Sequence, residues 1–209
     1  MARAPLTYRR LLGLDRSGGP PAATRKGQPL RPWTLPNAIG FVRLGLIPVL
    51  MAFAFTAPDG QSLTAALIFA FVSATDYLDG IVARVTNQYS RFGALLDPLV
   101  DRVLIVSGVV VCWSFELLPR WALAVLAARE LFMLVSSELA LRRGIDLNVT
   151  MLGRWAVWPT MFSLGLAMVD DGWLPEASLF LGLAMTLVAT VEYVRYALAQ
   201  LRGGPSTSA

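Results

Sequence analysis

The chain has 209 residues, of which 56% are hydrophobic and only 15% are charged. Because soluble domains carry about 25% charged residues, this composition argues against a soluble enzyme and favours a small bundle of membrane helices. The sequence contains no histidine, which excludes a histidine-based catalytic triad and histidine-ligated zinc, and its single cysteine, Cys112, excludes a disulfide framework.

Residues 1–33 form a basic segment that is rich in proline and glycine. Seven of the 18 basic residues lie before residue 32 and flank the first apolar run. Positive charge beside the first membrane helix is typical of a cytosolic segment. The net charge of +4 therefore has a membrane explanation, and we expect no nucleic-acid partner. We predict a basic cytosolic arm over residues 1–33 that is partly mobile.

Six apolar runs follow the arm, and each has about the 20 residues that a helix needs to span a bilayer. The predicted spans are 37–57, 62–85, 92–115, 119–141, 151–170 and 174–200. The fold class is therefore an all-α membrane protein, a bundle of six transmembrane helices with a short N-terminal cytosolic segment. The predicted domain covers residues 34–202, and a short polar tail follows over residues 203–209.

The charges of the loops alternate along the chain. The second and fourth loops carry arginines, whereas the first, third and fifth loops carry mostly acids. Arginine and lysine collect on the cytosolic side of a membrane. Both termini and the arginine-bearing loops are therefore predicted to face the cytosol, with the protein in the cell (inner or plasma) membrane.

Four aspartates interrupt the second and third apolar runs. They are Asp76, Asp79, Asp97 and Asp101. An ionised carboxylate in hydrocarbon is costly unless it faces a wet cavity, a partner or a metal. Residues three or four apart share one helix face, and the two helices are consecutive and antiparallel. The four carboxylates are therefore predicted to converge near the cytosolic end.

Such a cluster needs cations, because four like charges cannot stay ionised together in a low-dielectric site. Carboxylate oxygens suit Mg²⁺ or Mn²⁺, with two ions expected, and such ions would bind a diphosphate and activate a hydroxyl. Gly80 and Gly93 leave room for a ligand, and Arg84, one turn nearer the cytosol, is suited to phosphate oxygens. The plainer alternative is that the acids pair with Arg43, Arg84 and Arg102 and only lock the helices together.

The frame Asp76-x2-Asp79-Gly80-x2-Ala83-Arg84-x8-Gly93-x3-Asp97-x3-Asp101 resembles the signature of the CDP-alcohol phosphotransferases at all eight fixed positions. Members of this family are six-helix membrane enzymes in which a CDP-linked lipid donates its phosphatidyl group to an alcohol and CMP leaves. The resemblance implies CDP-diacylglycerol as the donor, a location in the lipid bilayer and a homodimer.

The resemblance also implies roles for individual residues. Asp76, Asp79, Asp97 and Asp101 resemble the metal ligands, and Asp101 also resembles the catalytic base for the acceptor hydroxyl. The residues that match the contacts to the CDP part of the donor are Asn37, Gly80, Ala83, Arg84, Ser90 and Gly93.

Two further matches concern the acceptor. The opening Pro36-Asn37-x5-Arg43 and the ending Glu192-Tyr193 are most similar to family members with a glycerol-type acceptor, the phosphatidylglycerophosphate synthases and cardiolipin synthases of this fold. We expect glycerol 3-phosphate as the acceptor. Phosphatidylglycerol is the alternative, because the segment 153–157 lacks the second cation that is typical of phosphatidylglycerophosphate synthases.

Three arginines are placed to bind the acceptor: Arg129, Arg154 and Arg195. An arginine within a span is a functional candidate by default. Arg129 has a structural alternative as the partner of Glu130, and Arg195 has one as a side chain that extends to the membrane interface.

A cation transporter is the rival from another class, because intramembrane acids also suit an ion pathway. Both acid pairs, however, are predicted near one cytosolic mouth, and the sequence shows no internal repeat of the kind that transporters use. The sequence therefore favours the enzyme.

Overall fold

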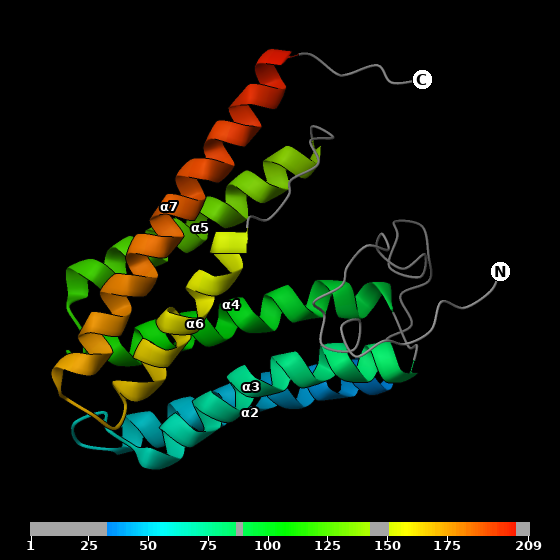
Figure 1. Ribbon diagram of the computed structural model, residues 1–209. Helices are drawn as coiled ribbons and strands as arrows, with labels where there is room; N and C mark the ends of the chain where they lie inside the picture. The colour runs from blue at the N-terminus through cyan, green and yellow to red at the C-terminus, as the bar shows by residue number, and fades with distance from the viewer. Residues whose placement is uncertain (1–32, 87–89, 143–150, 204–209) are drawn as a thin grey trace.

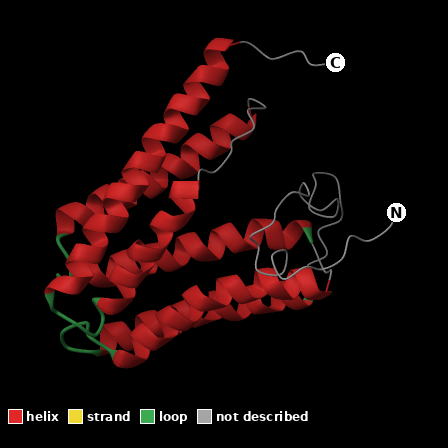
Figure 2. Ribbon diagram, in the orientation of Figure 1, coloured by secondary structure: helices red, strands yellow, loops and turns green. Residues whose placement is uncertain are grey.

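The computed structural model describes residues 33–86, 90–142 and 151–203, although some side chains inside these ranges, including those of residues 77–80 and 83–86, lie outside the description. Every regular element in the described ranges is an α-helix (Figures 1 and 2). The helices are α2 (Leu35–Thr56), α3 (Leu63–Thr86), α4 (Arg91–Ser114), α5 (Arg120–Arg142), α6 (Met151–Leu166) and α7 (Trp173–Gly203). The predicted arm, apart from Trp33, and the predicted tail, apart from Gly203, lie outside the described residues.

The six helices coincide with the six predicted spans, and all but one of the predicted ends lie within three residues of the observed ones. The exception is the end of the fifth span, which the apolar pattern predicts at residue 170 and which the structure has at Leu166. The chain tightens there, because the N–H groups of Val169 and Asp170 both donate to the Leu166 carbonyl at 2.9 Å. The Met168 carbonyl then accepts a bond of 2.7 Å from the Ser62 N–H, which anchors the turn to the loop before α3.

Polar caps start the two helices that frame the candidate site. Thr34 caps α2, where its hydroxyl accepts a bond from the Asn37 N–H at 3.4 Å and a proline occupies the first turn. Ser90 caps α4 and accepts a bond from the Gly93 N–H at 2.9 Å. Caps of this kind satisfy N–H groups that the first turn of a helix leaves free. Both helices therefore begin at well-defined positions at the same end of the bundle.

The helices form two groups that meet at one end of the molecule (Figure 1). In the first group α2 packs along α3 and α4, and in the second α7 packs along α6 and beside α5. Contacts of α3 and α4 with α6, and of α4 with α5, join the groups. Figure 1 shows the groups diverging from the turns at the lower left towards the ends where α2 starts and α7 stops. The second half of α3 and the first half of α4 lie at this diverging end.

The core lies where the two groups meet. Its most deeply buried side chains come from helices of both groups and include Phe69, Leu104, Leu126 and Leu164. Burial of such side chains contributes roughly 1.5–3 kcal/mol each relative to exposure in water. The packed end of the bundle is therefore the rigid support from which the more open end extends.

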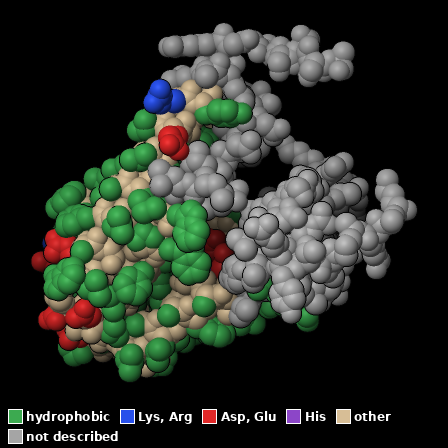
Figure 3. All heavy atoms as spheres, viewed as in Figure 1, with side chains coloured by type: hydrophobic (Ala, Val, Ile, Leu, Met, Phe, Trp, Pro, Cys, Tyr) green, Lys and Arg blue, Asp and Glu red, His purple; other side chains and the backbone are tan. Residues whose placement is uncertain are grey.

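The outer surface is strongly apolar. Large side chains such as Leu131, at 63% exposure, face outward, and hydrophobic side chains cover much of the described surface in Figure 3. By length and composition, two helical segments in the described part can cross a membrane, α2 and Trp173–Tyr196 of α7. Helix α6 has only 16 residues, and α3, α4 and α5 carry charged residues along their length. The structure is thus all-helical with two long apolar helices, and the six spans and the homodimer stay predictions.

Candidate active site

Helices α3 and α4 bring the predicted acids to the same depth. Asp76 lies ten residues before the end of α3, and Asp101 lies ten residues after the start of α4. At a rise of 1.5 Å per residue, each is about 15 Å from the short connection between the helices. The antiparallel pair therefore places the two carboxylates level with each other, as the spacing of the acids predicts.

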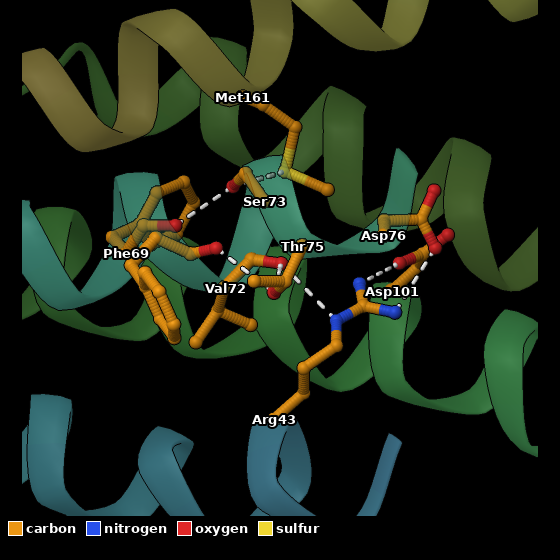
Figure 4. A network of polar contacts seen from close by, with 9 residues as sticks. Arg43, Phe69, Val72, Ser73, Thr75, Asp76, Asp101 and Met161 are labelled. Carbon is orange, nitrogen blue, oxygen red and sulfur yellow. Dashed lines mark hydrogen bonds and ion pairs between the residues drawn. The ribbon is translucent and has the colours of Figure 1, made fainter. Parts of the chain in front are cut away.

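A buried arginine from α2 joins these two carboxylates (Figure 4). Arg43 donates from Nη1 to Asp76 Oδ1 at 3.0 Å and from Nη2 to Asp101 Oδ1 at 2.8 Å. Its Nε donates to the Val72 carbonyl at 3.1 Å. The Arg43 side chain is 1% exposed, whereas those of Asp76 and Asp101 are 44% and 36% exposed. Arg43 thus covers part of the acidic pair, and both carboxylate side chains stay partly exposed.

Asp97 belongs to the same electrostatic group. Its side chain is half-buried on α4, one turn before Asp101, and it interacts electrostatically with Asp76 and Arg43. Asp101 in turn interacts with both Asp76 and Asp97. Asp79 lies on α3 one turn after Asp76, and its side chain is outside the described residues. Three of the four predicted acids therefore form one cluster on neighbouring helices.

The side chains of the cluster provide the kind of ligand atoms that a hard divalent cation prefers. Its groups are carboxylate oxygens, the preferred ligands of Mg²⁺ and Mn²⁺, and a cationic guanidinium already lies between two of them. Among the described side chains, no three acidic residues are close enough to hold a single ion. The fourth aspartate, Asp79, is outside that set. The carboxylate oxygens therefore fit the predicted ions, but they do not define where the ions would lie.

Three of the residues predicted to contact the donor lie against one another at the starts of α2 and α4. Asn37 and Ser90 are both buried, and the Ser90 hydroxyl donates to Asn37 Oδ1 at 3.1 Å. A Cβ atom at Gly93 would lie 2.5 Å from the same Asn37 oxygen and 3.2 Å from the Ser90 hydroxyl. A side chain at this position would displace the Asn37 amide from its bond with Ser90, so glycine leaves the space that this contact needs. These three residues form a polar junction between the helices, a packing role that the sequence pattern did not indicate.

The remaining predicted donor contacts follow the acids along α3. Gly80, Ala83 and Arg84 lie on this helix, between Asp79 and the connection to α4, and their side chains are outside the described residues. The same holds for Arg154, which lies in the first turn of α6. The predictions for these residues rest on their positions along the helices.

The other two predicted acceptor arginines line a groove between α5 and α7. The groove has a volume of about 480 Å³, and its lining is apolar apart from Arg129, Thr190 and Arg195. Arg129 Nε donates to the Thr190 hydroxyl at 3.1 Å, and Arg129 also forms an ion pair with Glu130. The ion-pair alternative for Arg129 is thus realised, in addition to its position in the groove. Arg195 is exposed on α7.

The structure adds residues that the sequence reasoning did not assign to the site. The sequence predicts Arg43 as a partner of the acids and places it in the opening match Pro36-Asn37-x5-Arg43, without a role at the site, and its pairing with Asp76 and Asp101 is confirmed. An arginine inside an apolar run is by itself a functional signal. Two further side chains in the described part carry a buried polar atom without a hydrogen-bond partner, at Arg102 Nη1 and at the Tyr193 hydroxyl. Arg102 follows Asp101 directly on α4.

Comparison with known proteins places the chain in a family. The profile of the family described as CDP-alcohol phosphatidyltransferase matches residues 33–191. A "Cardiolipin synthase (CMP-forming)" of Streptomyces coelicolor is 33% identical over 88% of this chain and 89% of its own. A "CDP-diacylglycerol--glycerol-3-phosphate 3-phosphatidyltransferase" of Bacillus subtilis is 28% identical over 77% of this chain and 93% of its own. A "Putative cardiolipin synthase" of Mycobacterium tuberculosis is 36% identical over 61% of each chain.

These matches extend across the helices that carry the acidic cluster and agree with the eight-position signature. The chain therefore belongs to the CDP-alcohol phosphatidyltransferase family and is an enzyme of that type.

Proposed function

We propose that this enzyme transfers the phosphatidyl group of CDP-diacylglycerol to a hydroxyl of phosphatidylglycerol, with release of CMP and formation of cardiolipin. The observation that carries the choice of acceptor is the groove between α5 and α7, which is apolar along its length and holds Arg129 and Arg195. An apolar lining suits acyl chains, and arginine suits a phosphate oxygen pair. The similarity to the cardiolipin synthase of Streptomyces coelicolor, at 33% identity, supports the same acceptor.

The acidic cluster is the proposed catalytic centre. Asp76, Asp79, Asp97 and Asp101 would hold two Mg²⁺ or Mn²⁺ ions through carboxylate oxygens. When bound, such ions polarise the diphosphate of the donor and make the acceptor hydroxyl a stronger acid. A free aspartate, with a pKa near 4, is a poor base for an ordinary alcohol, so this activation is what allows an aspartate to serve.

The reaction then needs one base and one leaving group. Asp101 accepts the proton of the acceptor hydroxyl, and the hydroxyl oxygen forms a bond to the phosphorus that carries diacylglycerol. The bond between that phosphorus and the bridging oxygen breaks, and CMP leaves with the electron pair. Arg84, one turn nearer the connection between α3 and α4, is the proposed contact to the diphosphate of the donor, with Gly80 and Ala83 leaving space for it.

We also propose that all six helices cross the cell membrane, with both termini and the acidic cluster on the cytosolic side. The apolar outer surface supports this placement, because large exposed hydrophobic side chains are stable in lipid. The acidic side chains of the turns at the lower left of Figure 3 would then face away from the cytosol, which agrees with the positive-inside rule.

Glycerol 3-phosphate is the second candidate acceptor. The similarity to the glycerol-3-phosphate enzyme of Bacillus subtilis, over 93% of that protein, favours it. Arg129 and Arg195 would then bind the phosphate of a small acceptor, and the apolar groove would serve only for packing against lipid.

A panel of acceptors distinguishes the two. The purified protein is assayed in mixed micelles with CDP-diacylglycerol and Mg²⁺ or Mn²⁺. Phosphatidylglycerol, glycerol 3-phosphate, inositol phosphate or serine is added as the acceptor, and the lipid products are identified by mass spectrometry. We expect cardiolipin and CMP with phosphatidylglycerol. Phosphatidylglycerophosphate as the main product would establish the second candidate, and no CMP with any acceptor would contradict the proposed reaction.

A groove-filling variant sharpens the same panel. Ala128 lines the groove, so an indole in Ala128→Trp should block acyl chains and raise the KM for phosphatidylglycerol about tenfold, a change of ~1.4 kcal/mol. Ala127→Trp is the matched control, because Ala127 is exposed on the same helix and does not line the groove. Equal effects of the two substitutions on the KM for phosphatidylglycerol would show that the groove does not bind the acceptor.

A further inference from the structure

Arg43 donates two hydrogen bonds to the acidic cluster and a third to the backbone of α3. It comes from α2, its two targets come from α3 and α4, and it is 1% exposed (Figure 4). We propose that Arg43 is a positioning residue for the cation site: it holds Oδ1 of Asp76 and Oδ1 of Asp101, so that the second oxygen of each carboxylate is directed to the open side for a divalent ion. This inference rests on the metal site of the proposed function.

The planar guanidinium suits this task. Nη1 and Nη2 diverge from one carbon, and each meets a different carboxylate, at 3.0 Å and 2.8 Å. The spacing of the two nitrogens therefore sets the separation of the two oxygens that they bind. Because arginine presents its donors in a rigid fork, the separation is fixed as long as the plane of the guanidinium is fixed.

A backbone oxygen fixes that plane. Arg43 Nε donates to the Val72 carbonyl at 3.1 Å, and the same carbonyl accepts a bond of 3.0 Å from the buried Thr75 hydroxyl. Val72 lies one turn before Asp76 on α3. The guanidinium is thus anchored to the backbone of the helix that carries Asp76. A rotation of the guanidinium plane would break the bond between Nε and the Val72 carbonyl.

Exposure shows that part of each carboxylate side chain remains available. Arg43 is buried, while the side chains of Asp76 and Asp101 keep 44% and 36% of their surface. Without the guanidinium, two carboxylates facing each other would repel and turn apart. Partners that orient metal-binding groups from behind in this way typically contribute 10–100-fold to metal affinity.

The test measures metal binding without catalysis. The full chain, purified in detergent without donor or acceptor, is titrated with Mn²⁺, and free ion is followed by electron paramagnetic resonance. We expect Arg43→Met to weaken Mn²⁺ affinity about 10–100-fold. Arg43→Lys should recover only part of the loss, because an ammonium keeps the charge but cannot hold both carboxylates and the carbonyl.

Arg120→Met is the matched control, since Arg120 forms a salt bridge at the other end of the bundle, with Glu116. Its Mn²⁺ affinity should equal that of the wild type. The melting temperature of each variant without metal separates stability from affinity, because a purely structural arginine would lower the melting temperature and leave the affinity of the folded protein unchanged.

The outcomes are distinct. Wild-type or tighter Mn²⁺ binding by Arg43→Met, or full wild-type affinity in Arg43→Lys, would overturn the positioning role while leaving the proposed function intact. If Arg43→Met does not fold, the affinity of Arg43→Lys alone decides. Absence of Mn²⁺ binding by the wild type would instead overturn the metal site of the proposed function, and the inference with it.

Discussion

The Asp101 side chain is held by a hydrogen bond and is also partly exposed. One oxygen accepts the Arg43 bond at 2.8 Å, and the side chain as a whole is 36% exposed. A carboxylate that is held by a hydrogen bond and keeps part of its surface exposed has a restricted orientation towards a proton donor. This geometry suits a general base, whose partner must come within hydrogen-bond distance in a fixed orientation.

Replacement of this one group tests the assignment. Asp101→Asn keeps the size of the side chain and an oxygen for Arg43, but an amide does not accept the hydroxyl proton. We expect turnover to fall by about 10²–10⁴-fold, while CDP-diacylglycerol still binds. CMP release and donor binding are measured in parallel. Asp171→Asn, at an exposed turn, is the control with normal turnover, and wild-type-like turnover of Asp101→Asn would exclude the role.

At the scale of whole helices, the contact between α6 and α7 is the closest in the second group. A Cβ atom at Gly182 of α7 would lie 2.8 Å from the Thr160 backbone nitrogen and 3.1 Å from the Thr160 Cα of α6. Those atoms belong to a helix backbone and cannot rotate away. Small residues at such crossings let membrane helices approach closely, where packing rather than water drives their association.

The crossing gives a prediction for stability. Gly182→Ala should destabilise the protein by about 1–3 kcal/mol, because the added methyl forces the two helices apart. Gly45→Ala is the matched control on α2, where a Cβ meets nothing within 4 Å, and alanine there should be neutral or favourable by up to about 1 kcal/mol. Thermal unfolding in one detergent at one scan rate compares the two. A melting temperature for Gly182→Ala at or above that of Gly45→Ala would contradict the close crossing.

On the scale of the whole molecule, the two helix groups are joined at one end and diverge at the other (Figure 1). The joined end carries the first, third and fifth turns, with acidic residues, and the diverging end carries the start of α2 and the end of α7. A donor whose nucleotide is water-soluble and whose tail is lipid can enter such a site from the side. The proposed orientation puts the diverging end on the side of the membrane that supplies the nucleotide.

Cysteine labelling tests this orientation. The native Cys112 is buried and should stay silent towards a membrane-impermeant maleimide. Asp59→Cys and Asp171→Cys, both exposed in the turns of the joined end, should react in right-side-out membrane vesicles. Ser206→Cys, near the C-terminus, should react only in inverted vesicles. The reverse pattern would show that the site faces away from the cytosol.

Much of this protein follows from the sequence alone, because the relevant signals are local. Apolar run length predicts the six helices, and the three- and four-residue spacings predict that Asp76 and Asp101 come together across an antiparallel pair. The one boundary that the pattern misplaces, the end of α6, depends on a bond between Met168 and Ser62, which are far apart in the chain. Hydropathy along the chain contains no information about such a bond.

What only the tertiary structure decides are the contacts between helices. Arg43 meets Asp76 and Asp101 across 33 and 58 positions, and Asn37 meets Ser90 across 53. Helical periodicity determines which face a residue occupies, but the partner of that face depends on how separate helices pack, through the shapes of side chains that touch only in the fold. For that reason the sequence by itself identifies the acids and the family, whereas the structure decides that a buried arginine holds two of those acids in place.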